Sequence, residues 1–457
     1  MMLGLYGRRV LYSDHEVITK ENIAEVISGL FSDFQQNRHE IKTLYDIYTG
    51  KTDILNKKKE VRPEINHKVC ENHAYEIVSF FSGYTFGEPV QYVHSGSCDT
   101  NDDALQELNR YMAMCSKDAC DSSMADWLFI CGVAYRLVLA GREDEPESPL
   151  RVISLDPRDT FVVRSTSLDR RIVMAGTCSF SSDGRYQTWT CYTKDAKFTV
   201  KSSAMDGVSV DFSTDLTVEE NTLGVIPIVE YEANTARMGA FEPVVDLLNA
   251  VSELQSNRMD DVVQTVNSFV ALIGCALDDK SYKELQEKKM LYLPDGTDAK
   301  YLTCPLDQNG IQTLKDDMID AIITICGMPN RNGGSSTSDT GSAVILRDGW
   351  QSAEARAQTV EKRFKPSEYR FLSIALSILK VQTGFSGLET QEIEIKFTRR
   401  NYSNLLTKVQ SLTTMLENNK IHPESAYVGS GLFTDPVAAY RKGMEWYERM
   451  EHRMDTN

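Results

Sequence analysis

Hydrophobic residues recur every three or four positions through the centre of the chain and predict three long helices. The first apolar stripe consists of Val244, Leu247, Leu248, Val251, Leu254, Met259, Val262, Val266 and Phe269. The second consists of Ile311, Leu314, Met318, Ile322 and Ile325, and Gly327 and Pro329 predict its end. The third helix is predicted from near Ser342 to about Leu379, with an interruption at Pro366.

Two short stretches interrupt this helical pattern. Three apolar runs, Phe269–Ile273, Met290–Leu293 and Tyr301–Thr303, lie between the first two helices, with a turn at Pro294–Gly296. They predict a small β-rich cap carried on two antiparallel helices. Residues 331–341 contain three glycines, three serines and two threonines. This composition fits a flexible connection and also a mobile loop at a lumen or binding site, and it does not separate the two.

The flanking regions predict a mixed α+β fold. After a poorly ordered lead-in over 1–20, helices are predicted at Glu21–Thr49, His67–Phe81 and Asp102–Phe129. An antiparallel sheet is predicted next, with strands at Val133–Leu139, Arg151–Leu155, Thr160–Arg164, Ile172–Phe180, Tyr186–Thr193, Lys197–Lys201 and Ile226–Glu230. A short strand is expected at Val90–Val93, and a turn at 183–184 joins two of the strands. The C-terminal part predicts a strand at Gln391–Thr398 and helices at Ser403–Glu417 and Pro436–Met450, joined by a turn-rich stretch.

The composition is that of a soluble globular protein with two to four domains. The chain has 457 residues, of which 41% are hydrophobic and 25% charged. It contains no run of 18 apolar residues and no apparent secretion signal, so no membrane span is expected. The ten cysteines form no C-x-x-C pair, and we expect reduced core thiols of an intracellular protein.

The net charge of −17 limits the possible nucleic-acid functions. A protein that grips DNA through its phosphates normally carries a basic face. So acidic a chain is compatible with a surface past which DNA slides, with no nucleic acid at all, or simply with solubility.

No motif predicts catalysis, a cofactor or a metal site. Gly50-Lys51-Thr52 matches the end of a phosphate-binding loop, but Tyr45 stands where the first glycine is needed and the tripeptide follows a helix. The acidic pairs at 260–261 and 316–320 favour solvated or interface helix faces, since adjacent helical carboxylates point about 100° apart. The charged segment Lys51–Arg62 is interpreted as a solvated loop.

Several motifs in order resemble the portal proteins of tailed bacteriophages, in the branch found in many long-tailed phages. The first group is Tyr48-x-Gly50, Asn66-His67-Lys68-Val69 and Gly83-Tyr84-x-x-Gly87-x-Pro89-Val90-x-Tyr92. The second is Gly224-x-Ile226-Pro227-Ile228-Val229, Val244–Asn249 and Asn257-Arg258-Met259-Asp260-Asp261. The third is Gly327-Met328-Pro329 followed by Thr340-Gly341-Ser342-Ala343. Together they cover nearly the whole chain.

The resemblance implies a portal-like architecture with a helical stem, a β-rich clip, a mixed wing and a helical crown. It assigns 1–240 to the wing, 241–267 and 307–329 to the stem helices, and 268–306 to the clip. It assigns 330–341 to a tunnel loop, 342–400 to a long kinked wing helix and strand, and 401–457 to the crown.

The resemblance also implies roles for particular residues. The expected DNA-facing tunnel-loop residues are Arg331, Asn332, Gly333, Gly334, Ser335, Ser336, Thr337, Ser338, Asp339, Thr340, Gly341 and the flanking Arg347. The expected docking residues of the clip are Tyr282, Lys283, Lys288, Lys289 and Asp295. The expected ring-interface residues of the stem are Val244, Leu248, Val251, Leu254, Val262 and Ile322.

The implied function is structural and not enzymatic. A ring, normally of twelve subunits, would stand at one capsid vertex, nucleate head assembly and conduct double-stranded DNA during packaging and ejection. Its partners would be the large terminase, a head-completion adaptor, and scaffolding and major capsid proteins, with assembly in the host cytoplasm. Two alternatives remain at this stage: another ring-forming head–tail or injection-system protein, and a nucleic-acid packaging ATPase.

Overall fold

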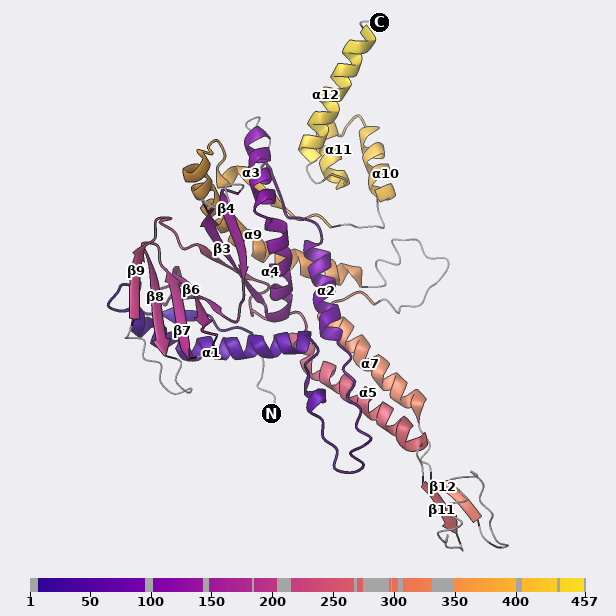
Figure 1. The fold of residues 1–457 in the computed structure, drawn as a ribbon. Coiled ribbons are helices and arrows are strands. Elements are labelled where there is room, and N and C mark those ends of the chain that lie inside the picture. The colour runs from indigo at the N-terminus through magenta and orange to yellow at the C-terminus, as the bar shows by residue number, and fades with distance from the viewer. Residues whose placement is uncertain are drawn as a thin grey trace. The chain divides into compact units, whose positions relative to one another are not determined.

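The computed structural model has a mixed α+β fold (Figure 1). It describes residues 7–94, 102–142, 148–182, 185–203, 215–266, 269–273, 296, 298–302, 307–330, 349–399, 405–433 and 436–455. The chain forms two compact units. The first unit comprises Met1–Tyr48, Ala74–Pro243 and Cys326–Asn457, and the second comprises Thr49–His73 and Val244–Ile325.

The first unit contains a six-stranded sheet in the order β1-β5-β6-β7-β8-β9. Its strands are β1 (Leu11–Ser13), β5 (Thr160–Ser165), β6 (Ile172–Phe180), β7 (Tyr186–Tyr192), β8 (Ala196–Ser203) and β9 (Asp215–Glu220). All neighbours are antiparallel except β1, which runs parallel to β5. The sequence predicted β5 to β8 but not the two edge strands. β1 is too short to show a pattern and lies in the predicted lead-in, and β9 is rich in acidic residues.

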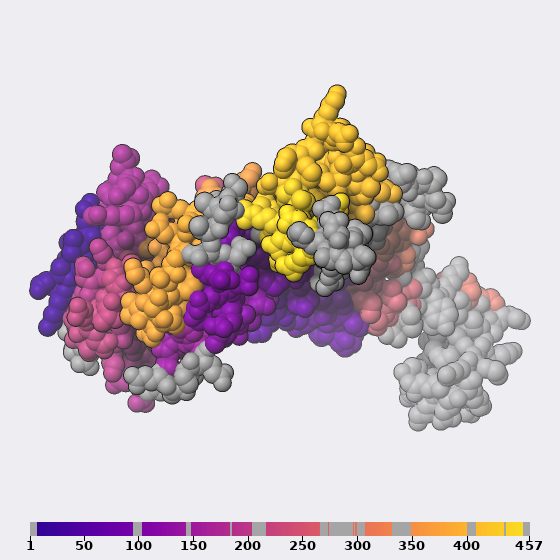
Figure 2. Space-filling model, turned by 90° about the horizontal axis from the view of Figure 1, so that it is seen from above, coloured from indigo at the N-terminus to yellow at the C-terminus, as the bar shows by residue number. Residues whose placement is uncertain are grey.

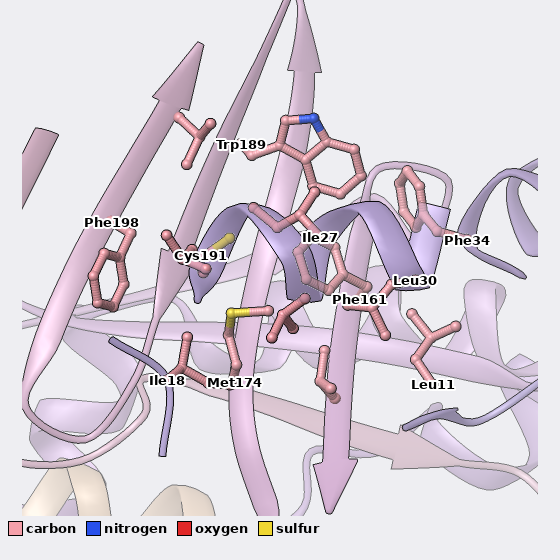
Figure 3. Packing of buried hydrophobic residues seen from close by; sticks show 14 of the residues in the cluster. Leu11, Ile18, Ile27, Leu30, Phe34, Phe161, Met174, Trp189, Cys191 and Phe198 are labelled. Carbon is pink, nitrogen blue, oxygen red and sulfur yellow. The ribbon is translucent and has the colours of Figure 1, made fainter. Parts of the chain in front are cut away.

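Helix α1 (Ile23–Tyr48) packs its apolar stripe against this sheet (Figure 3). Ile27, Leu30 and Phe34 of the helix are buried against Phe161 and Trp189 of the sheet. The ring centroids of Phe34 and Trp189 lie 5.1 Å apart in an edge-to-face arrangement, which is favourable for aromatic pairs. The core of this unit therefore follows from the helical and strand periodicities seen in the sequence.

A second sheet has the order β10-β3-β4, all antiparallel. Its strands are β3 (Val133–Ala140), β4 (Leu150–Leu155) and β10 (Ile228–Glu232). Four elements come before β3 in the chain: α2 (His73–Phe86), β2 (Gln91–His94), α3 (Asp102–Met114) and α4 (Lys117–Cys131). The single helix predicted over 102–129 is wrong, because Ser116 adopts a left-handed conformation with φ of 52° and separates α3 from α4. The helix predicted over 67–81 begins only at His73 and continues through Gly83 to Phe86.

Helix α9 (Trp350–Thr383) packs against β10, β3 and β4. The predicted interruption at Pro366 is wrong, because the helix continues through it. Proline removes one helical N–H donor, but the buried side chains of Phe364 and Glu368 anchor the helix on both sides. The predicted start at Ser342 lies outside the described residues.

The C-terminal segment pairs a strand with β2 and ends in three helices. After the 3₁₀ turn η3 (Thr390–Glu392), strand β13 (Ile393–Lys396) runs antiparallel to β2. The helices are α10 (Leu405–Leu416), α11 (Pro423–Ser430) and α12 (Pro436–Asp455). Helix α11 replaces the predicted turn-rich stretch. His422 caps it by accepting a hydrogen bond from the Glu424 backbone N–H, and Pro423 occupies its first turn.

The second unit confirms the predicted pair of helices with a small β element. Helix α5 (Val245–Val266), preceded by a 3₁₀ turn η2 (Glu242–Val244), and helix α7 (Gln308–Cys326) lie side by side (Figure 1). Strands β11 (Phe269–Ile273) and β12 (Asp298–Leu302) pair antiparallel between them in the chain. A 3₁₀ turn η1 (Asp53–Asn56) belongs to the same unit. The predicted run Met290–Leu293 lies outside the described residues.

A buried cluster of charged side chains links the elements of the first unit. Glu368 of α9 and Arg136 of β3 are both fully buried, and the Arg136 guanidinium donates to the Glu368 carboxylate at 2.8 Å. Lys117 of α4 lies 2.9 Å from the other Glu368 oxygen. The hydroxyls of Tyr92 on β2 and Tyr231 on β10 donate to Glu368 at 2.6 and 2.8 Å. One carboxylate thus connects five elements.

Asp121 of α4 completes the cluster by pairing with both Lys117 and Arg136. Burial alone would raise the pKa of Glu368, but Arg136, Lys117 and the Tyr92 hydroxyl lower it below its ordinary value. For Asp121 burial dominates and raises the pKa. Two anions face two cations, so no net charge is left in the core, as a buried cluster requires.

We predict that Glu368→Gln destabilises the protein by about 3–5 kcal/mol, because Arg136 and Lys117 would then share only Asp121 as a buried counterion. Tyr92→Phe removes a single hydrogen bond and should cost about 1 kcal/mol. Urea unfolding followed by circular dichroism measures both. Glu25→Gln on α1, whose side chain is 78% exposed, is the control and should change little. Equal stability of Glu368→Gln and the control would contradict the role assigned to the cluster.

Candidate stem and channel site

The central feature of the second unit is Asp260 of α5, whose side chain is 1% exposed. One carboxylate oxygen accepts from the Lys57 and Lys59 ammonium groups at 3.1 and 3.0 Å. The other accepts from the backbone N–H of His67 at 2.7 Å and lies 2.8 Å from the His67 ring Nδ1. Asp260 therefore holds the segment 57–67 against α5.

Neighbouring contacts extend this attachment along α5. The Ser256 hydroxyl accepts from the Val69 backbone N–H at 2.9 Å, and Asn257 accepts from Lys57 at 2.8 Å. These bonds hold residues 67–69 in a non-helical path, which explains why the predicted helix at His67 does not form. Residues 57–69 cover Asp260 and Ser256 of α5, whereas Glu253 and Asn257 on the polar face stay exposed.

The same segment also reaches α7, and α7 is bonded to α5. Lys315 of α7 lies 2.6 Å from Glu71. The Arg258 guanidinium of α5 donates to Gln308 at 2.7 Å and to Gln312 at 2.8 Å, both on α7. These polar contacts join the two helices and the segment 57–71 into one body.

The electrostatics of Asp260 follow from these contacts. Burial by itself would raise its pKa, but the hydrogen bonds from His67, Lys59 and Lys57 together lower the pKa well below the ordinary value of 3.8. The carboxylate therefore stays ionised at neutral pH and keeps both lysines in place.

Two interpretations of the sequence need correction here. Lys57 and Lys59 do not belong to a freely solvated loop, since their side chains are only 16% and 26% exposed and both bind Asp260. Asp260 is likewise buried and does not lie on a solvated face of its helix. The motifs Asn66–Val69 and Asn257–Asp261 are each visible in the sequence, but nothing in their spacing shows that they meet.

A family model described as "Phage portal protein, SPP1 Gp6-like" matches residues 28–450. The chain belongs to the phage portal proteins. A search of curated protein sequences finds no match.

Among solved structures, the portal chain is similar to chains of gene transfer agent (GTA) particles. One is from the "Virion of native gene transfer agent (GTA) particle", with 13% identity, a TM-score of 0.46, and coverage of 86% of this chain and 94% of that chain. Another is from the "Neck of empty GTA particle computed with C6 symmetry", with 13% identity, a TM-score of 0.45, and coverage of 79% and 90%. A third is from the "Neck of native GTA particle computed with C12 symmetry", with 12% identity, a TM-score of 0.44, and coverage of 79% and 89%.

The predicted stem-interface residues of this portal chain fall into two groups. Val244, Leu248, Val251 and Ile322 are buried within the single chain, so their apolar area is already removed from water. Leu254 is half-buried, and Val262 is 40% exposed. A ring contact would gain little from the buried group, and the ring-interface role of all six stays a prediction.

The other predicted site residues of the portal chain belong to the tunnel loop and the clip. The tunnel-loop residues Arg331–Gly341 and Arg347 lie outside the described residues, and so do the clip residues Tyr282, Lys283, Lys288, Lys289 and Asp295. Their roles also stay predictions.

Within the described ranges, no group of three or more histidine, cysteine or acidic residues is arranged to hold a metal ion. In the same ranges, no helix combines the length and apolar character needed to cross a membrane.

The cysteines that the structure describes form no disulfide: Cys120, Cys131, Cys178, Cys191 and Cys326 are buried thiols, and Cys70 and Cys115 are half-buried.

Gly50 ends α1 with φ of 83°, and Lys51 and Thr52 lead into η1. The tripeptide 50–52 therefore follows a helix, the reverse of a phosphate-binding loop, as the sequence predicted.

We predict that Asp260→Asn lowers the free energy of unfolding by about 2 kcal/mol, because Lys57 and Lys59 lose their shared counterion. The destabilisation caused by Asp260→Asn should have its full size at about pH 6 and should become smaller as the pH falls below about 4. The sign follows from the depressed pKa: ionised Asp260 stabilises the fold above its unfolded-state pKa, and this stability disappears as the carboxylate is protonated.

Urea titrations of both proteins from about pH 6 down to about pH 2 measure the effect, with hydrogen exchange over residues 57–69 as a local readout. Asp261→Asn is the matched control, since it removes the adjacent charge without touching this cluster. A pH-independent difference between the wild type and Asp260→Asn would contradict the role of the ionised carboxylate.

Proposed function

We propose that this chain is the portal subunit of a phage particle, forming a ring, normally of twelve copies, at one vertex of the capsid. The family match over residues 28–450 carries the proposal. In this role the ring nucleates head assembly, conducts double-stranded DNA during packaging and ejection, and performs no catalysis of its own. It assembles in the host cytoplasm and remains in the virion.

The second unit supports a stem role. Its two helices are joined by Arg258, and Asp260 of α5 is buried under the segment 57–67. Four apolar side chains remain exposed on these helices: Met259, Val262, Leu314 and Ile325 are between 40% and 47% exposed. A neighbouring copy in a ring is suited to bury them, because each subunit of a closed heterologous ring covers part of the next.

The acidic charge supports a conducting channel. Each tight phosphate contact would hold DNA in place, whereas a chain of net charge −17 repels the polyanion on average. The small hydroxyl side chains of the proposed tunnel loop 330–341 would touch phosphates without anchoring them. Arg331 and Arg347 would supply the positive contacts there.

Docking partners are assigned by region. We propose that the clip, 268–306, receives the large terminase during packaging and a head-completion adaptor afterwards, through Tyr282, Lys283, Lys288, Lys289 and Asp295. Scaffolding and major capsid proteins would bind the wing or the crown. The ATPase that drives packaging is then a separate protein, in keeping with the incomplete phosphate-binding motif at Gly50–Thr52.

Native mass spectrometry with negative-stain microscopy of the purified chain tests the ring. We expect a closed ring of about a dozen subunits with a central hole. If the chain is monomeric, the measurement is repeated with scaffolding and capsid proteins from the same particle, because some ring proteins assemble only with a scaffold. A monomer under both conditions would overturn the proposal.

Deletion of Gly333–Thr340 tests the tunnel loop. We expect intact rings but reduced DNA packaging or retention, because the channel would lose its weak phosphate contacts. The measurement is the yield of nuclease-protected DNA per assembled particle. A deletion of the same length at 204–211, between β8 and β9 in the chain, is the control. Full DNA yield from the tunnel-loop deletion would remove the loop's role and leave the ring proposal standing.

A further inference from the structure

Two ion clusters of the first unit contain equal numbers of cations and anions. The Glu368 cluster has two of each. In the other, Arg8 lies 2.7 Å from Glu242 and 3.1 Å from Glu40, and Arg9 lies 3.0 Å from the second oxygen of Glu40. A balanced cluster leaves no net charge in a region of low dielectric constant, which lowers the cost of burying it.

A third cluster, around Glu230 of β10, contains more cations than anions. The Glu230 side chain is 4% exposed, and its carboxylate lies 2.8 Å from Arg164 of β5 and 2.7 Å from Arg237. Glu232, two residues further along the strand, lies 2.7 Å from Arg237 and 3.7 Å from Arg363 of α9. Three guanidinium groups therefore share two carboxylates.

Arg370 of α9 brings a fourth guanidinium group to this Glu230 cluster. It lies on the same side of the helix as Arg363 and Ser367, which come seven and three residues earlier. The Ser367 hydroxyl donates to the Glu230 carbonyl oxygen at 2.7 Å, so this side of α9 runs along β10. Arg370 is half-buried and forms no hydrogen bond or ion pair with any residue that the structure describes. The cluster thus carries a surplus of two positive charges.

The electrostatics of Arg370 agree with this count. Burial lowers its pKa, and the like charge of Arg164 lowers it further, whereas Glu230 opposes both effects. For Arg237 burial also lowers the pKa, but Glu230 outweighs burial there and the pKa is raised. Among the described residues, Arg370 therefore lacks a counterion of the kind that Arg237 has.

The surplus charge lies where the two sheets of the first unit meet. Arg164 belongs to β5 of the six-stranded sheet and Glu230 to β10 of the second sheet. The side chains of Arg164 and Arg363 are 28% and 40% exposed. Figure 2 shows the orange surface of the α9 region beside the magenta surface of the six-stranded sheet, with both open on the face in view. A small ion can therefore reach these guanidinium groups from solvent.

The number and the kind of these groups select the ligand. Guanidinium groups bind oxyanions well, because their N–H donors match two oxygen atoms at once. A monovalent ion such as chloride would balance one of the two surplus charges, whereas a dianion of the phosphate type would balance both. A nucleic-acid backbone is a poorer match, because its remaining phosphates would meet a chain of net charge −17.

We propose that Arg164 and Arg370 bind a phosphate-type dianion, either the free ion or the phosphoryl group of a small molecule. Glu230 and Glu232 hold the neighbouring arginines in place. The site goes beyond the proposed ring, since a single copy of the chain carries all of it. The bound dianion fastens α9 to the six-stranded sheet and so stabilises the first unit.

Thermal unfolding in sodium chloride and in sodium phosphate of equal ionic strength tests the site. We expect Arg370→Gln to be at least as stable as the wild type in chloride, because it removes a cation that Arg164 repels. Phosphate should raise the melting temperature of the wild type by about 2 °C more than that of Arg370→Gln. Lys380→Gln, at an exposed position in the last turn of the same helix, is the matched control and should keep the full phosphate effect. The control also accounts for the general stabilising effect of phosphate on proteins.

Titration calorimetry identifies the source of the dianion. The probes are inorganic phosphate, glycerol phosphate and a short DNA duplex, and Arg370→Gln should weaken binding of the occupant by about tenfold. Preferred binding of inorganic phosphate assigns the site to the free ion, and preferred binding of glycerol phosphate assigns it to a phosphoryl group. Tighter binding of the duplex would assign the cluster to nucleic acid and overturn the proposal.

Two results of the unfolding experiment would also overturn it. A loss of stability of Arg370→Gln in chloride would show that Arg370 has a structural role only. An equal phosphate effect on the wild type and Arg370→Gln would place the effect elsewhere. Neither result bears on the ring, which native mass spectrometry reports separately.

Discussion

The first unit depends on the burial of one carboxylate. Glu368 lies at the centre of a long helix, and four side chains from four other elements complete its coordination. An uncompensated charge at this depth would cost several kcal/mol, so α9, α4, β2, β3 and β10 must all reach their positions together. The apolar core supplies most of the driving force for folding, since many more side chains are buried there than in the ion cluster. The cluster also fixes the register of α9 against its neighbours, because a shift of α9 by one residue would rotate Glu368 away from its partners.

The second unit repeats this logic on a smaller scale. Asp260 fixes the path of a segment that comes almost 200 residues earlier in the chain, through two lysines and a histidine. The apolar stripe of α5 could pack in more than one orientation, but only one places Asp260 beneath His67. In both units, hydrophobic periodicity brings the elements together and a buried charge chooses among the arrangements that periodicity allows. In the proposed ring the same choice has a further consequence, since an error in the helix pair of one copy would be passed to its neighbours.

The elements that follow one period for many residues could be predicted from the sequence. The α5 and α7 helices, the strands from β5 to β8 and helix α1 have the predicted type and nearly the predicted bounds. The failures have physical causes. Ser116 in a left-handed conformation breaks a helix without glycine or proline, and the packing of α9 overrides Pro366. Neither effect leaves a local signal. The Asp260 cluster could not be predicted for another reason: a lysine run gives the same pattern whether it is solvated or paired with a distant carboxylate.

The same distinction applies to the surfaces proposed for the ring. Apolar periodicity identified the stem stripe, but it does not separate side chains that fill the chain's own core from those left for a neighbour. The structure separates them: Val251 and Ile322 are buried, whereas Val262 and Leu314 are exposed on the same two helices.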